Sequence, residues 1–224
     1  MKYLLFLLLS FSVYAEHKTP HRIRVVPDYI DENGLQTTTE LNLYQGSTYI
    51  NQFVEYETED NLTVGAYFNN LPINVVGYHQ TYTDDSYIGM SKWWGDKSQL
   101  RFGISSQIGT QLTGSNSNLL AFTTTQLQYT VFNSLTISVG PWWGNNAMTT
   151  VGNYVGASVN LGYKLNDSIR IEGSWYSGST NLSGAVINSF YTVRKGIECY
   201  VGMQIPATNS GNEFAGNIGL NYHF

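Results

Sequence analysis

The last eleven residues of the chain alternate strictly between apolar or glycine positions and small or polar ones. Side chains of a β-strand point to opposite faces in turn, so such alternation indicates a strand with two different faces. Counting back by twos from the terminal Phe224, one face carries Tyr222, Leu220, Ile218, Gly216 and Phe214. The other carries His223, Asn221, Gly219, Asn217 and Ala215. One face suits lipid and the other suits water.

Similar alternating segments, separated by turn residues, recur along most of the chain. Twelve are predicted as strands: 36–44, 48–58, 62–69, 86–94, 99–112, 119–132, 135–143, 151–164, 168–177, 183–193, 196–205 and 214–224. Every second link is short and polar (59–61, 95–98, 133–134, 165–167 and 194–195), and most of the others are longer. The pattern predicts an all-β fold, a transmembrane up-and-down antiparallel β-barrel of twelve strands.

Two segments fit the count of twelve less well. The link 45–47 is unusually tight for an outer loop, and the segment 183–193 alternates poorly. A barrel of ten strands is therefore the alternative.

Composition agrees with a membrane barrel. Charged residues make up 12% of the chain, against roughly 25% in ordinary soluble domains. After residue 15 no apolar stretch reaches the length of a membrane helix, so a chain that spans a bilayer must do so as a closed barrel. The competing interpretation is a secreted soluble β-sandwich or lipocalin-like barrel. A net charge of −5 argues against nucleic acid as a partner.

The amino-terminal residues predict export. Residues 1–15 combine a short positive start, an apolar run and the small-residue pattern Val13-Tyr14-Ala15, which is typical of a cleaved signal peptide. Residues 16–34 lack alternation and hold Lys18, Arg22 and Arg24, so we expect a periplasmic lead-in or a partial plug of the barrel. Residues 35–224 form the predicted barrel domain. The single cysteine, Cys199, excludes an intramolecular disulfide.

The terminal strand resembles the closing strand of bacterial outer-membrane β-barrels, and the whole pattern resembles a small porin-like barrel of about twelve strands. In that family the final aromatic residue is part of the signal read by the barrel assembly machinery. The resemblance implies that Phe224 is an assembly signal, that outer-membrane lipid and the assembly machinery are partners, and that the bacterial outer membrane is the location.

Apolar registers assign the remaining positions to two faces. The predicted lumen-lining residues are Glu40, Glu55, Tyr67, Arg101, Gln107, Tyr154, Arg170, Glu172, Glu198 and Tyr200. Arg170 and Glu172 share a face and could pair with each other, or across to Glu198 and Arg101. Such charges could form a closed network or a charged constriction that selects solutes. The predicted aromatic girdle at the membrane interfaces consists of Trp94, Trp143, Trp175 and Tyr222. For the inward member of each adjacent Trp pair, a sugar-stacking platform is the alternative.

Candidate enzyme chemistry is sparse. No His two residues before a Ser lies on a predicted strand, as an outer-membrane lipase would need. His79 with Asp84 and Asp85 only weakly resembles a protease pair, and Glu16, His17 and His21 form only a loose cluster for a metal. The sequence therefore predicts neither an enzyme nor a cofactor or metal site.

The predicted function is a narrow passive channel for small polar solutes. A channel for acidic sugars is disfavoured, because only two or three cations are assigned to the lumen. The alternative is a non-conducting barrel that serves as a surface scaffold, an adhesin or a partner in an envelope complex.

Overall fold

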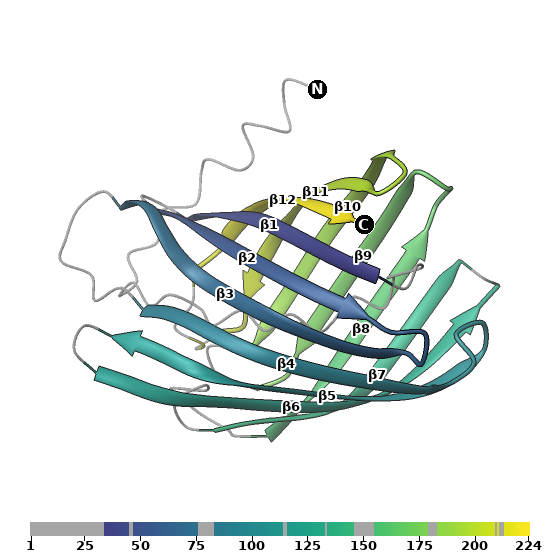
Figure 1. Ribbon diagram of the computed structural model, residues 1–224, viewed down its shortest axis with the longest axis horizontal. Coiled ribbons are helices and arrows are strands. Elements are labelled where there is room, and N and C mark those ends of the chain that lie inside the picture. The colour runs from purple at the N-terminus through teal and green to yellow at the C-terminus, as the bar shows by residue number, and fades with distance from the viewer. Residues whose placement is uncertain are drawn as a thin grey trace.

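The computed structural model contains a closed barrel of twelve antiparallel strands, each paired with its neighbours in the chain (Figure 1). It describes residues 34–44, 47–75, 83–113, 116–132, 134–145, 155–178, 183–208, 210 and 213–224. The predicted twelve-strand barrel is confirmed, and the alternative of ten strands is wrong. The predicted signal peptide and most of the predicted lead-in or plug, residues 1–33, lie outside the described residues.

The strands run over nearly the predicted ranges. Their bounds are β1 (Gly34–Tyr44), β2 (Ser47–Glu57), β3 (Leu62–Val75), β4 (Thr83–Gly95), β5 (Leu100–Thr113), β6 (Asn116–Val131), β7 (Leu135–Gly144), β8 (Val155–Lys164), β9 (Ile169–Tyr176), β10 (Gly184–Arg194), β11 (Ile197–Pro206) and β12 (Ala215–His223).

The barrel closes where the first strand pairs with the last. In Figure 1 the purple β1 lies beside the yellow β12, and their register pairs Glu40 with Gly219 and Thr38 with Asn221. The backbone amide of Phe224 also donates to the carbonyl of Leu35 at 2.9 Å. This pairing leaves no free sheet edge, as a barrel in lipid requires. We call the β1–β12 junction the seam.

The outward face of the barrel is apolar. Ile88, Leu119 and Val201 are 65%, 59% and 59% exposed, which would be costly in water but suits a lipid surface. Lys92, at the short-turn end of β4, is a charged side chain on this face. Its Nζ donates to the carbonyl of Asp60 in the adjacent short turn, so this cation lies at the rim. Within the described part of the chain, no helix is long and apolar enough to cross a bilayer.

Short turns join the strands at the end of the barrel that carries Gly34 and Phe224, which we call the short-turn end. In the turn between β4 and β5, Ser98 donates its backbone amide at 2.8 Å and its hydroxyl at 2.7 Å to Asp96 Oδ1. These bonds stabilise the ionised carboxylate and lower the pKa of Asp96. Their support for the turn is therefore complete at neutral pH and is lost only as the pH falls through that lowered value.

The predicted outer link 70–85 is partly wrong. β3 continues to Val75 and β4 begins at Thr83, so both strands extend into the predicted loop. Register shifts lie between Thr48 and Tyr49 and between Ile50 and Gln52, and Asn70 has a φ of 60°. An irregular strand of this kind loses its strict alternation, which explains why the pattern in the sequence ended at 69.

A matched pair of substitutions on β9 tests which face meets lipid. Ile171 faces outward and is 40% exposed, whereas Ser174 faces inward and is half-buried. Ile171→Arg is expected to lower the free energy of unfolding by about 2–4 kcal/mol if it lies near the bilayer midplane. Ser174→Arg is expected to cost less than half as much. Refolding from urea into lipid vesicles measures both, and equal losses would contradict the assignment of the faces.

Candidate functional site: the barrel interior

The structure places the predicted lumen-lining residues on the inward face of the strands. Glu40, Glu55, Tyr67, Arg101, Gln107, Glu198 and Tyr200 are buried there, and Arg170 and Glu172 are half-buried. Tyr154 lies outside the described residues. Whether this interior conducts solutes remains a prediction, and the contacts below define what it could do.

Glu40 is the centre of a hydrogen-bonded cluster at the seam. Its carboxylate, 0% exposed, accepts from Asn51 Nδ2 at 2.9 Å, Tyr200 Oη at 2.7 Å and Asn217 Nδ2 at 3.3 Å. The donors lie on β2, β11 and β12, so one side chain of β1 links four strands. Gly219, the register partner of Glu40, makes room, because a Cβ there would lie 2.1 Å from the Tyr200 ring. The cluster ties both sides of the seam together.

Arg170 organises a second cluster, which contains three of the predicted lumen charges. Its Nε lies 2.7 Å from Glu172 Oε1 and its terminal nitrogen 3.1 Å from Glu198 Oε2. The guanidinium also lies over the Phe190 ring, 4.3 Å from its centroid. Glu198 in turn accepts from Asn221 Nδ2 at 3.0 Å. Two carboxylates thus share one cation, which leaves a net negative charge.

Arg101 does not join that cluster. It donates to Gln128 Oε1 at 3.0 Å and lies over the Trp93 ring, 4.2 Å from its centroid. Arg101 is the second residue of β5, at the short-turn end, whereas Arg170 lies four strands away on β9. The sequence left a pairing of Arg101 with the Arg170 cluster open, and the structure shows two separate sites.

Of the aromatic side chains buried inside the barrel, Tyr67 and Tyr200 were predicted as lumen-lining, whereas Phe53, Tyr87 and Phe122 were not. Phe53, Tyr67, Tyr87, Leu120, Phe122, Trp142 and Tyr176 form one buried cluster on the inward face. The Trp142 ring lies over Gly156 of β8, where a Cβ would come within 2.5 Å of it. An inward glycine opposite an inward aromatic therefore lets the ring lie against the wall. The available signal was a glycine in register with an aromatic, which becomes visible only when the strand pairing is known.

The inner wall differs in exposure around the barrel. Inward side chains of β1 to β7 are mostly buried, as Asn51, Thr63 and Thr124 illustrate. On β8 to β10 several are half-buried: Asn160, Arg170, Glu172, Ser174 and Asn188. Arg170 and Glu172 retain 16% and 21% side-chain exposure. A water-accessible strip, which we call the open strip, therefore runs along β8–β10.

The predicted girdle residues point outward. Trp94, Trp143, Trp175 and Tyr222 are each between 39% and 50% exposed. Trp94 and Tyr222 lie near the short-turn end of their strands, and Trp143 and Trp175 near the opposite end. Their neighbours Trp93 and Trp142 face inward. Anchoring of the girdle at the two membrane interfaces remains a prediction that these positions support.

No protein-family model and no curated protein matches the chain. Solved structures do resemble it. The KdgM porin in complex with disordered oligogalacturonate has a TM-score of 0.60 at 12% identity and aligns over 84% of this chain and 99% of that one. The NanC porin has a TM-score of 0.58 at 9% identity and aligns over 85% of this chain and 99% of that one. An outer-membrane channel from Pseudomonas putida F1 has a TM-score of 0.57 at 9% identity, over 91% and 100%. The chain has a porin-like fold.

Proposed function

We propose that the protein is a narrow passive channel for small polar solutes in a bacterial outer membrane. The observation that carries the proposal is the open strip along β8–β10, a polar and charged inner surface accessible to water. It lies inside a closed barrel whose outward face is apolar. Water-accessible polar groups inside a lipid-facing wall are what a diffusion pathway requires.

The proposed location rests on the outward face and on the likeness to outer-membrane porins and channels. Outer-membrane lipid and the barrel assembly machinery are the proposed partners. The neighbours are channels and porins, which agrees with the expectation that this chain is not an enzyme. Among the described residues, no three His, Cys, Asp or Glu side chains gather as a metal site.

Inward charges indicate which solutes are disfavoured. The buried or half-buried inward charges among the described residues are six carboxylates (Glu40, Glu55, Glu57, Asp85, Glu172 and Glu198) and two guanidiniums (Arg101 and Arg170). This excess of negative charge opposes anions. Although the KdgM porin is similar in fold and was solved with oligogalacturonate, we do not propose an acidic sugar as the solute of this chain.

Conductance in planar lipid bilayers tests the proposal directly. The purified, refolded barrel is expected to give small, discrete current steps in potassium chloride, with potassium more permeable than chloride. A barrel that inserts and stays folded but carries no current would overturn the channel.

The second candidate is a non-conducting barrel used as a scaffold, adhesin or partner in an envelope complex. The near-complete burial of inward side chains on β1–β7 favours it, because closely packed side chains narrow the passage through the barrel. The same recording separates the two, since a scaffold gives no current.

The terminal residue offers a test of assembly. Phe224 is 77% exposed and its ring stacks on Tyr222 with centroids 6.5 Å apart, so few intramolecular contacts depend on it. Deleting Phe224 is expected to lower the amount of folded barrel in the outer membrane of cells several-fold, yet to leave refolding into vesicles nearly unchanged. Fractionation of membranes measures the first and gel mobility the second. Unchanged yield in cells would contradict a role as assembly signal.

A further inference from the structure

Five of the side chains that hold unsatisfied buried polar groups lie on one part of the inner wall, and two others, Gln36 and Asn217, lie at the seam. Ser91 Oγ, both polar atoms of Gln126, Ser138 Oγ, Trp142 Nε1 and both polar atoms of the Asn160 amide are buried, with no hydrogen-bond partner among the described residues. They lie on β4, β6, β7 and β8. Buried polar groups are normally paired with protein or ordered water, so a cluster of unpaired ones indicates a ligand.

The seam provides the contrast. There the inward polar side chains bond to one another: Thr38 donates to Asn221 at 2.8 Å, Gln204 to Asn42 at 3.0 Å, and Asn51 to Glu40 at 2.9 Å. The two walls have similar residue types. At the seam only single oxygens of Gln36 and Asn217 are unpaired, whereas on the wall of β4–β8 both polar atoms of Gln126 and both of Asn160 are unpaired. The wall of β4–β8 therefore has capacity left for a molecule that passes or binds.

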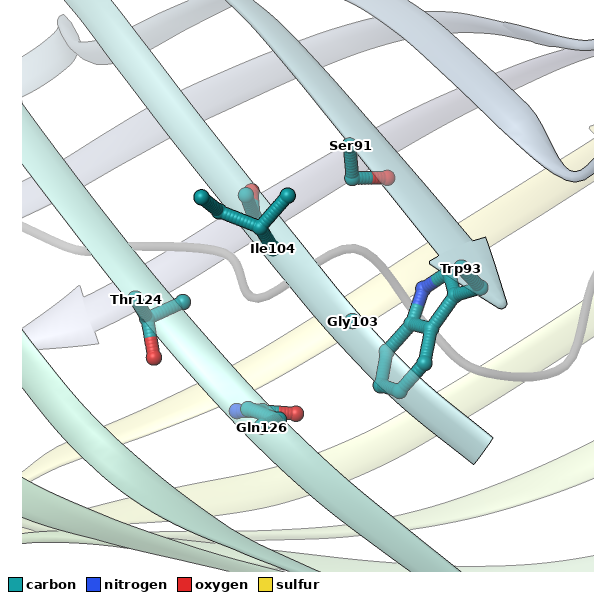
Figure 2. A pocket seen from close by; sticks show the side chains of 7 residues that line it. Ser91, Trp93, Gly103, Ile104, Thr124 and Gln126 are labelled. Carbon is teal, nitrogen blue, oxygen red and sulfur yellow. The ribbon is translucent and has the colours of Figure 1, made fainter. Parts of the chain in front are cut away.

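A small cavity marks one position on that wall. It is bordered by residues of β4, β5 and β6: Ser91, Trp93, Gly103, Ile104, Ser105, Thr124 and Gln126. Figure 2 shows all of these except Ser105 with labels. The Trp93 ring covers Gly103, where a Cβ would come within 2.5 Å of it. Ser91 and Gln126 are 2% and 3% exposed. The space is about 10 Å³ for the centre of a water-sized group, enough for one hydroxyl.

The unpaired atoms specify the chemistry of that group. Gln126 offers two N–H donors and a carbonyl acceptor, and Ser91 offers a hydroxyl that does both. An ammonium ion only donates, and would leave the amide N–H groups unpaired. An anion only accepts, and the carboxylates of the interior repel it. A hydroxyl group both donates and accepts and carries no charge, so it matches the site.

We propose that the β4–β8 wall binds neutral polyhydroxylated solutes, with one hydroxyl of the solute seated between Ser91, Trp93 and Gln126. The proposal rests on the proposed channel function, for which it names the solute class. Further hydroxyls of the same solute would meet Ser138, Trp142 and Asn160 along the wall. A water molecule has the same chemistry, so the test must separate bound water from a bound solute.

Two sugars that share the same glucose ring distinguish bound solute from bound water. Methyl glucoside donates and accepts, whereas its permethylated form only accepts. Titration of the folded barrel in detergent, followed by tryptophan fluorescence, is expected to saturate with methyl glucoside and to show at least tenfold weaker binding of the permethylated sugar. The potassium chloride current in planar bilayers, recorded with the same sugars, is expected to fall saturably with methyl glucoside only.

Three variants locate the site. Gln126→Leu removes only unpaired polar atoms, so the barrel is expected to fold as well as wild type while the half-saturating concentration rises about tenfold. Ser91→Ala is expected to raise it several-fold. Gln204→Leu alters an inward glutamine that is hydrogen-bonded to Asn42 near the seam. It is the matched control and should leave sugar binding unchanged.

The outcomes are distinct. A potassium chloride current without any saturable sugar response would overturn the proposed site and leave the channel intact. Saturable binding of methyl glucoside by a barrel that carries no current would overturn the channel and support the site. An ordered water in the cavity together with no sugar binding would show that the wall holds water alone, and sugar binding unaffected by Gln126→Leu would overturn the placement.

Discussion

Replacing Glu40 with alanine is expected to lower the free energy of unfolding by about 3 kcal/mol or more. The substitution removes the acceptor of Asn51, Tyr200 and Asn217, and each buried donor left unpaired costs roughly 1–3 kcal/mol. The loss is concentrated at the seam, where β1 must pair with β12 to close the barrel. Urea unfolding in lipid vesicles, followed by tryptophan fluorescence, measures the change.

Glu40→Gln is the conservative comparison. The glutamine keeps the shape and one acceptor oxygen but turns an N–H group toward neighbouring donors, so about half of the loss is expected. Thr39→Ala is the control for loss of a polar group on the same strand. It removes the 2.7 Å hydrogen bond that the Thr39 hydroxyl donates to Gln52, and it should lower the free energy of unfolding by less than about 1.5 kcal/mol. A Glu40→Ala barrel as stable as wild type would show that the cluster does not hold the seam.

Alternation in the sequence predicted the strands because lipid and water impose opposite demands on successive residues. Ile171 and Glu172 illustrate this: a charge on the outer position would be costly, so the inner one receives it. The rule depends only on whether a residue faces lipid or the lumen. This explains why it located the twelve strands and the inward positions. Beyond residue 69 the backbone of β3 is irregular and the alternation is lost, so the predicted strand ended too early.

The same rule misread the inward apolar residues. The segment 183–193 alternated poorly because Phe190 of β10 is inside, with its ring 4.8 Å from that of Tyr200 and beneath Arg170. An aromatic residue is allowed there because it packs on neighbours that lie far away in the chain. Such packing depends on the register between strands, which the sequence of one strand does not contain.

Residue spacing alone places two inward charges side by side only along a single strand, and it left the partners across strands open. Arg170 and Glu172 are two residues apart and therefore share a face, and the structure pairs them. Glu198 lies on β11 and Arg170 on β9, and β10 runs between the two strands. The Arg170 guanidinium crosses over the ring of Phe190 on β10 and so reaches Glu198. Arg101 could equally have paired with an inward carboxylate, but its position on β5 places it against Gln128 and Trp93 instead. Distances across a barrel follow from strand order and tilt, which composition does not fix.

The open strip gives the proposed channel its sharpest electrical test. Arg170→Gln removes the cation shared by Glu172 and Glu198 and makes the local charge more negative by one. At about 5 Å in a wet passage one charge changes the energy of an ion by roughly 1 kcal/mol, with opposite sign for potassium and chloride. The two shifts add to roughly 2 kcal/mol, so the ratio of the two permeabilities is expected to rise about 20- to 30-fold, as the reversal potential across a salt gradient measures.

Two further variants decide whether the effect arises inside the barrel. Glu172→Gln changes the charge in the opposite direction at the same place and should lower the permeability ratio. Arg194→Gln makes the same change in net charge as Arg170→Gln, but at the exposed short-turn end of β10, where salt screens it and little change is expected. Since Arg170 and its partners keep 11–21% side-chain exposure, solvent weakens the ion pairs and only a modest loss of stability is expected. If Arg170→Gln instead strongly destabilises a barrel that never conducted, the three charges are a structural lock, and the non-conducting scaffold replaces the channel.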